Sequence, residues 1–200
     1  MDRSINLGEF SELENTLYSL LDHMRKSEVE QAAYEGRKYQ LQGLCAVQGY
    51  DPKLHASYFK IPGVKFGGED IFQDQQISLY DLGALAALQE AMEIDGAILI
   101  GKDGRLMHSG KFMLPDFSIY ERHQGAVKTY EKLQENGEAG TRHVTAVALS
   151  ALLPELTFTT LKSDRDDLRQ IRGGYIVRST VPGEVNYKVP TLYQQDLEAV

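Results

Sequence analysis

The feature that most restricts the fold is a hairpin pattern near the middle of the chain. Residues 95–100 are an apolar run led by an aspartate, and residues 106–113 are a second run that contains many apolar side chains. Between the two runs lie Asp103 and Gly104, a pair that favours the tight turn joining two antiparallel strands. We therefore expect a β-sheet at the centre of the fold.

Three other segments show strand patterns. Residues 39–47 predict a strand that closes at Gly49, residues 156–161 alternate threonine with apolar residues, and residues 175–178 follow two glycines that favour a turn. Residues 51–74 are rich in glycine, proline and aromatics, so we expect irregular structure with short strands there.

The first predicted helix begins after Ser11. Ser11 and Glu14 have the spacing of a capping box, and apolar residues then follow on one face as far as Met24. The helical pattern continues to about Tyr34, as the same helix or as a second one, and Gly36 ends it.

Three more helices are predicted further along the chain. One starts at Ser78 and ends near Met92, and another covers residues 120–133. The last covers residues 141–152, with Thr141 as its N-cap and Pro154 after its end.

These patterns predict one α/β domain, a mixed central sheet flanked by helices, over residues 37–180. Residues 1–36 are expected to form an N-terminal helical segment and residues 181–200 a peripheral C-terminal tail. The N-terminal helix either covers the core, the interpretation we favour, or serves as a regulatory or oligomerising arm.

Charge and composition exclude some classes of function. The net charge of −8 argues against a broad electrostatic contact with nucleic acid but not against a small anionic ligand. No run approaches the roughly 20 apolar residues of a membrane-spanning helix, and residues 1–6 lack the layout of a secretion signal. Cys45, the single cysteine, lies in an apolar setting typical of a buried strand thiol. We expect a soluble, cytoplasmic protein with no membrane or nucleic-acid partner.

Two segments carry residue types suited to chemistry. Asp95 precedes Gly96 and Ala97, so a carboxylate, which suits a divalent metal or a hydroxyl, stands at the start of a buried strand where glycine permits close approach. Residues 140–143 open a helix, whose free N–H groups and dipole suit phosphate, and they include Thr141, Arg142 and His143.

In this order, the two segments resemble the diadenylate cyclase family (the N-terminal domain of DisA), whose hallmarks are an Asp-Gly-Ala strand and a downstream Gly-Thr-Arg-His-Arg. The likeness extends through the hairpin and residues 109–115, and upstream to residues 43–47 and 77–78; it covers roughly residues 40–177.

The resemblance implies an enzyme that joins two ATP molecules across a face-to-face homo-oligomer. Each 3′-hydroxyl attacks the other molecule's α-phosphate and pyrophosphate leaves, which needs mainly positioning and charge neutralisation. Asp95 would bind Mg or Mn and orient the 3′-hydroxyl. The nucleotide-binding residues implied by the resemblance are Gly96, Ala97, Met113, Leu114, Thr141, Arg142, His143, Thr145 and Ser163.

Several positions depart from the family pattern. Val144 stands in place of a second arginine, Ile94 in place of a histidine and Ala151 in place of a glutamate, and the stretch 116–139 is about a dozen residues longer than expected. Because one arginine in a water-excluded phosphate site can contribute about 10³-fold or more to a rate, its loss can remove turnover and leave binding.

Three hypotheses therefore remain. The first is a divergent nucleotidyltransferase that makes a cyclic or linear dinucleotide second messenger. The second is a catalytically silent nucleotide sensor. The third is a structural or partner-binding domain, which predicts no thermal shift with any nucleotide. His108, His123 and His143 are not spaced as a metal cluster, and we interpret the aspartates at 164, 166 and 167 as part of a solvated turn.

Overall fold

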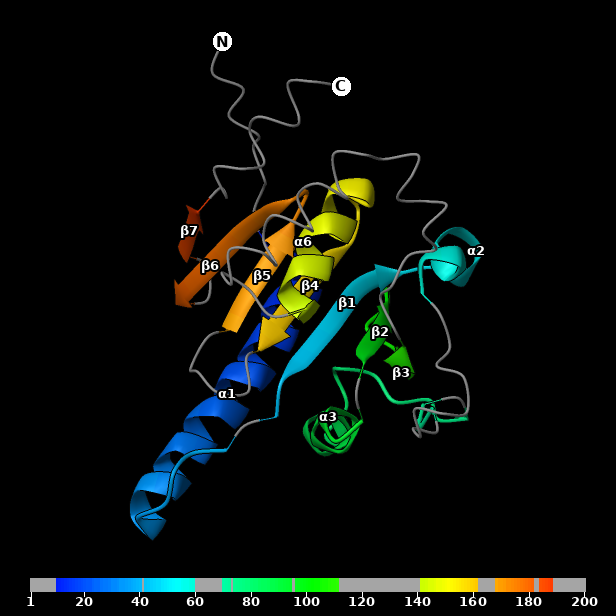
Figure 1. Ribbon diagram of the computed structural model, residues 1–200. Coiled ribbons are helices and arrows are strands. Elements are labelled where there is room, and N and C mark those ends of the chain that lie inside the picture. The colour runs from blue at the N-terminus through cyan, green and yellow to red at the C-terminus, as the bar shows by residue number, and fades with distance from the viewer. Residues whose placement is uncertain are drawn as a thin grey trace.

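A computed structural model of the chain describes residues 10–40, 42–59, 70–72, 74–94, 96–111, 141–161, 168–181 and 184–188. Within this part, seven strands form one sheet in the order β3-β2-β1-β4-β5-β6-β7 (Figure 1). The strands are β1 (Leu44–Tyr50), β2 (Ala97–Gly101), β3 (Leu106–Lys111), β4 (Thr157–Leu161), β5 (Leu168–Arg172), β6 (Tyr175–Val181) and β7 (Glu184–Lys188). The described helices are α1 (Glu12–Glu35), α2 (Pro52–His55), the 3-10 turn η1 (Ala56–Tyr58), α3 (Ala84–Met92) and α6 (Thr141–Leu152).

The sheet is mixed. β1 and β2 run parallel, with Cys45 opposite Ala97, whereas β1 and β4 run antiparallel. Together with the helices, this confirms the α/β class with a central mixed sheet and an N-terminal helix. None of the helices in the described ranges is long and apolar enough to cross a membrane.

The capping box at the start of α1 is confirmed. Glu14 N donates to Ser11 Oγ at 3.2 Å, and Ser11 N donates to Glu14 Oε2 at 2.6 Å. α1 continues as one helix to Glu35, and Gly36 ends it in the left-handed conformation at φ 65°. The helix therefore does not break at residues 27–30.

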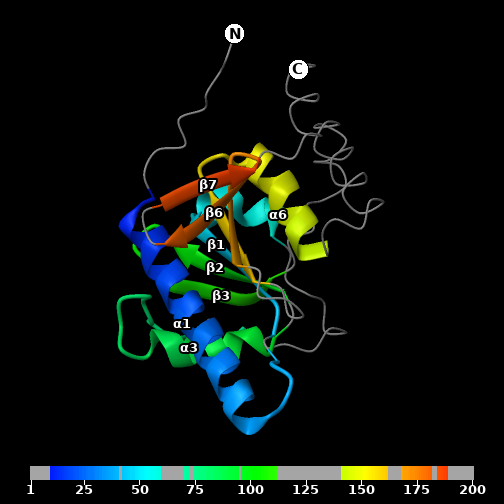
Figure 2. The ribbon, with the colours of Figure 1, turned by 90° about the vertical axis from the view of Figure 1, so that its left-hand side faces the viewer.

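Helices cover both faces of the sheet (Figure 2). Alternate strand residues such as Leu44, Ala46 and Ile98 pack with Leu17 and Leu21 of α1 and with Leu88 of α3. The other set, which includes Val47 and Leu99, packs with residues of α6. We call these the α1 face and the α6 face. The interpretation of α1 as a helix that covers the core is the one the packing supports.

The hairpin and α6 follow the sequence prediction. β2 and β3 pair antiparallel, and Gly104 turns the chain between them at φ 82°. α6 has the predicted bounds, and Ser150 near its end donates to Val147 O and accepts from Gly174 N, both at 2.9 Å. These contacts join α6 to the β5–β6 turn.

Two predicted starts are wrong. The first strand begins at Leu44, where pairing with Leu161 begins, and it continues past Gly49 to Tyr50. The second helix begins at Ala84 because residues 78–83 form turns. Ser78 N donates to Asp81 Oδ2 at 2.7 Å, which holds a turn, and Leu82 is fully exposed.

Three further predictions need correction. Within residues 51–74, the described part contains α2 and η1, with Asp51 as N-cap, and none of the expected short strands. β5 was missed, because we assigned the polar segment around Arg169 to a turn. β7 lies within the expected peripheral tail, yet it pairs with β6 and forms the end of the sheet. The expected helix at 120–133 lies outside the described residues.

Candidate functional site

Three of the predicted ligand-binding residues lie at the amino end of α6. α6 packs against β1, β4, β5 and β6. His143 and Thr145, in its first turns, are 5% and 3% exposed, and Arg142 is partly exposed. Two polar side chains of this helix end, those of His143 and Thr145, are therefore buried in the interior, whereas that of Arg142 reaches the surface in part.

Cys45 connects this helix end with the start of the β1–β2 pair. Its thiol is completely buried, as predicted. Burial raises the pKa of the Cys45 thiol to about 12, and the nearby positive charge of Arg142 opposes that shift. Cys45 is the strand partner of Ala97, and both belong to the same buried cluster as Ala146 and Val147 of α6, so α6 lies over the start of β1 and β2.

Gly96 has a structural reason to be glycine. Its backbone lies at φ 120°, and a Cβ atom at this position would stand 2.7 Å from the carbonyl carbon of Gly110 and 2.9 Å from its oxygen. Both values lie below the closest approach that real Cβ atoms show. The contact between the start of β2 and the end of β3 thus requires glycine without any ligand.

Part of the predicted site lies outside the described residues. This holds for Asp95, Met113, Leu114 and Ser163, and the side chain of Thr141 is likewise outside the description. Within the described part, no three His, Cys, Asp or Glu side chains come together as a metal site. The described residues of the predicted site lie on two parts of the fold. Gly96 and Ala97 stand at the start of β2, and Arg142, His143 and Thr145 lie in the first turns of α6, which packs against the neighbouring strand β1.

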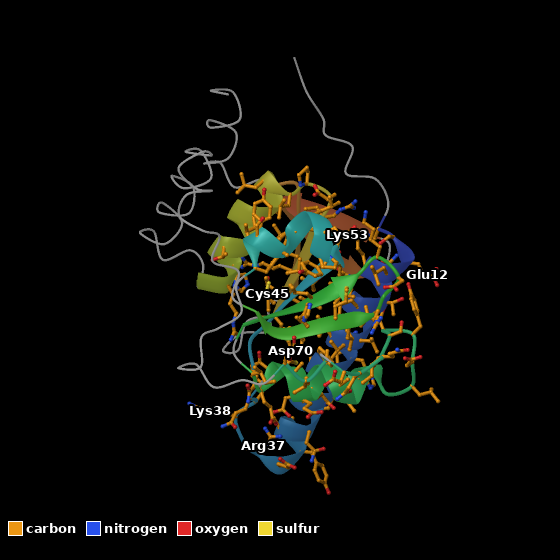
Figure 3. The ribbon with its side chains drawn as sticks, turned by 90° about the vertical axis from the view of Figure 1, so that its right-hand side faces the viewer. Glu12, Arg37, Lys38, Cys45, Lys53 and Asp70 are labelled. Atoms are coloured by element: carbon orange, nitrogen blue, oxygen red, sulfur yellow. The ribbon has the colours of Figure 1, made fainter. Side chains whose placement is uncertain are left out.

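A second polar cluster was missed by sequence reasoning. Asp70 Oδ2 and His108 Nδ1 are 2.6 Å apart, and Asp70 Oδ1 accepts from Ser109 N at 2.8 Å (Asp70 is labelled in Figure 3). His108, a histidine within a predicted strand, was a signal in the sequence that could have indicated this cluster. Its partner lies 38 residues earlier, in a segment without a recognisable pattern, so spacing could not reveal it.

Two aromatic residues and a second histidine pack beside this cluster. The Tyr50 ring contacts His108 edge-on at a centroid distance of 6.0 Å and Phe59 at 5.6 Å. His55 is 1% exposed; its Nδ1 accepts from Asp51 N at 2.9 Å, and its Nε2 lies 3.0 Å from Glu155 Oε1. With both nitrogens occupied, His55 has a structural role.

One groove lies on the opposite side of the sheet. It has a volume of about 470 Å³ and lies between α1 and α3, where Met24 and Met92 contribute to its lining. It is therefore separate from the end of α6 where the predicted residues meet.

No protein-family model matches this chain, and a search of curated proteins found no match.

Proposed function

We propose that this chain binds a nucleoside triphosphate, ATP in the first instance, at the amino end of α6. We propose further that it condenses two such molecules into a cyclic or linear dinucleotide and releases pyrophosphate, as a divergent protein of the diadenylate cyclase type. The observation that carries the proposal is the packing of α6 over the start of β1 and β2, where Ala146 and Val147 share one buried cluster with Cys45 and its strand partner Ala97. It supports a common site for the two sequence motifs.

The chemistry needs few side chains. The 3′-oxygen of one nucleotide forms a bond to the α-phosphorus of the other, the bond from that phosphorus to the pyrophosphate oxygen breaks, and the hydroxyl proton leaves. The first N–H groups of α6 and the Arg142 guanidinium would neutralise phosphate charge. His143 and Thr145, which are buried in the first turns of α6, would lie beside these phosphate-binding groups.

The proposed reaction would also use a divalent metal. A carboxylate such as that of Asp95 is an oxygen ligand that Mg and Mn prefer, and triphosphate oxygens and water complete such sites. When bound, the metal would offset charge on the phosphates. Since each subunit supplies one nucleotide, the reaction also calls for a homo-oligomer with facing sites.

A silent nucleotide sensor is the second candidate. It is favoured by Val144, which stands where the family has a second arginine, and by Ala151, which replaces a glutamate. In that case the chain would bind a nucleotide without turnover, and α1 and the opposite face of the sheet would transmit the signal.

The test is incubation of the purified chain with each nucleoside triphosphate and Mg or Mn, followed by mass analysis of products and a thermal-shift assay. We expect a dinucleotide from the wild type and none from Asp95→Asn. Arg142→Ala should lower the rate by about 10²-fold or more. Arg105→Ala is the matched control, because this exposed arginine is at the hairpin, the opposite end of β2.

Each outcome decides between the candidates. A thermal shift without product in every mixture supports the sensor. No shift with any nucleotide contradicts both candidates and leaves a structural or partner-binding domain, since a bound ligand must stabilise the folded state.

A further inference from the structure

The carboxylate of Asp70 is held by the edge strand of the sheet. Its side chain is 10% exposed, and its Oδ1 accepts from Ser109 N at 2.8 Å, from Ser109 Oγ at 3.3 Å and from Phe72 N at 3.2 Å. These bonds attach the segment at 70–72 to β3. The acceptor in all three bonds is Oδ1.

The second oxygen, Oδ2, holds the imidazole of His108. The distance to Nδ1 is 2.6 Å, and the ring also contacts Tyr50 edge-on. A carboxylate only accepts hydrogen bonds, so Nδ1 of the neutral ring carries the proton and Nε2 carries a lone pair. The His108 side chain is 31% exposed, and within the described ranges no group forms a hydrogen bond with Nε2.

His108 lies on the same face of the sheet as the candidate site. It stands directly opposite Leu99 on β2, and Leu99 belongs to the core under α6 together with Cys45 and Ala97. The ring therefore projects from the α6 face, two positions along β2 from Ala97. His55 differs, since it is buried and both of its nitrogens have partners.

We propose that the Asp70–His108 pair is a proton-accepting site, in which His108 Nε2 contacts a hydroxyl group of a ligand bound on the α6 face. Asp70 acts as a positioning residue, which orients the ring and offsets the charge of the imidazolium. This inference rests on the proposed function, under which the ligand is the nucleotide. Nε2 takes the 3′-hydroxyl proton as the oxygen bonds to the α-phosphorus and pyrophosphate leaves with the electron pair.

The first experiment needs no nucleotide. Diethyl pyrocarbonate acylates an accessible imidazole nitrogen that carries a lone pair, and peptide mass analysis locates the modified residue. We expect His108 to be acylated in the wild-type protein, and about tenfold more slowly in Asp70→Asn, because an amide is a weaker acceptor for the Nδ1 proton. An unmodified His108, or a faster reaction in Asp70→Asn from a loosened segment, overturns the proposal.

The second experiment separates the pair from the proposed function. In His108→Gln we expect the thermal shift with ATP and Mn to persist and dinucleotide formation to fall by about 10²–10⁴-fold. His23→Gln, an exposed change on α1, is the matched control and should retain the wild-type rate. If the wild type forms product and His108→Gln forms it equally fast, the proposal is overturned.

The two failures are distinguishable. A wild type that forms no dinucleotide contradicts the proposed enzyme. If acylation of His108 still depends on Asp70 in that case, the pair stands as a proton-accepting site for a different hydroxyl compound.

Discussion

At the scale of single residues, Gly96 shows how one position serves both a fold and a proposed site. Its positive φ and its contact with the Gly110 backbone both exclude a side chain. The resemblance to a nucleotide-binding motif assigns the same glycine to a ligand. The two explanations are compatible. The close approach of Gly96 to Gly110 brings the backbones of β2 and β3 together, and it does so beside Ala97, the next residue of the proposed site.

Gly96→Ala should lower the free energy of unfolding by about 3 kcal/mol, since the added methyl group meets backbone atoms and the conformation is strained. Gly83→Ala is the control: its φ is −83°, and an added Cβ there has no atom within 4 Å. The control should change stability by less than about 1 kcal/mol. Urea denaturation measures both, and equal effects would contradict the close approach.

The raised pKa of the Cys45 thiol makes the stability of the fold depend on pH. The folded pKa of about 12 lies above the ordinary value of 9.0, so the folded chain keeps the thiol proton that the unfolded chain loses. This stabilising contribution is complete below pH 9 and is lost between pH 9 and 12, at about 1.4 kcal/mol per pH unit.

The free energy of unfolding of the wild type should therefore fall more steeply from pH 8.5 to 10.5 than that of Cys45→Ala. Denaturation curves across this range give the two slopes. Parallel slopes would show that the thiol titrates at the same pH in the folded and unfolded chains.

At the scale of elements, the amino end of α1 is attached to the sheet by Glu14. This capping-box residue is 4% exposed, and it also accepts from Thr157 Oγ1 at 2.5 Å and pairs with Arg172 Nε at 3.2 Å. Gln48 of β1 also contacts the first turn of α1, where it donates to Leu13 O at 2.9 Å. One carboxylate thus links the start of the helix to β4 and β5.

Glu14→Ala should destabilise the protein by about 3 kcal/mol, because it removes the cap and leaves the Thr157 hydroxyl and the Arg172 guanidinium without this partner. Ser11→Ala removes only the cap and should cost about 1 kcal/mol. Chemical denaturation of Glu14→Ala, Ser11→Ala and Arg172→Ala, and of each of the first two combined with Arg172→Ala, gives the coupling energy. A coupling of zero between Glu14 and Arg172 would contradict the linkage.

At the scale of the whole molecule, the sheet extends from β3 to β7 without interruption. β7 covers the outer edge of β6, with Val177 opposite Tyr187 and Arg178 opposite Asn186. A strand edge left open presents unpaired backbone groups, which favour association with other chains. The segment expected to be a peripheral tail is therefore part of the sheet.

Truncation after Val181 removes β7 and should lower the free energy of unfolding by about 1–3 kcal/mol, with aggregation at higher concentration. Truncation after Lys188 is the matched control, because it keeps all seven described strands. Calorimetry and gel filtration compare the two. Equal stability would show that β7 contributes little to the sheet.

The sequence by itself determined the elements whose signals are local. The capping box at Ser11 and Glu14, the hairpin with Gly104 at its turn and the bounds of α6 all follow from residues a few positions apart. The assignment of Cys45 to a buried strand came from its immediate neighbours in the same way.

Only the tertiary structure decided the start of β1, the turn before α3 and the inclusion of β5 and β7, because strand pairing depends on partners distant in the sequence. The same reason applies to the candidate sites. Cys45 packs in one buried cluster with Ala146 and Val147, about a hundred positions away, and Asp70 meets His108 at the edge of the sheet. Local propensity does not record contacts of this kind, since their free energy comes from groups that only the folded chain brings together.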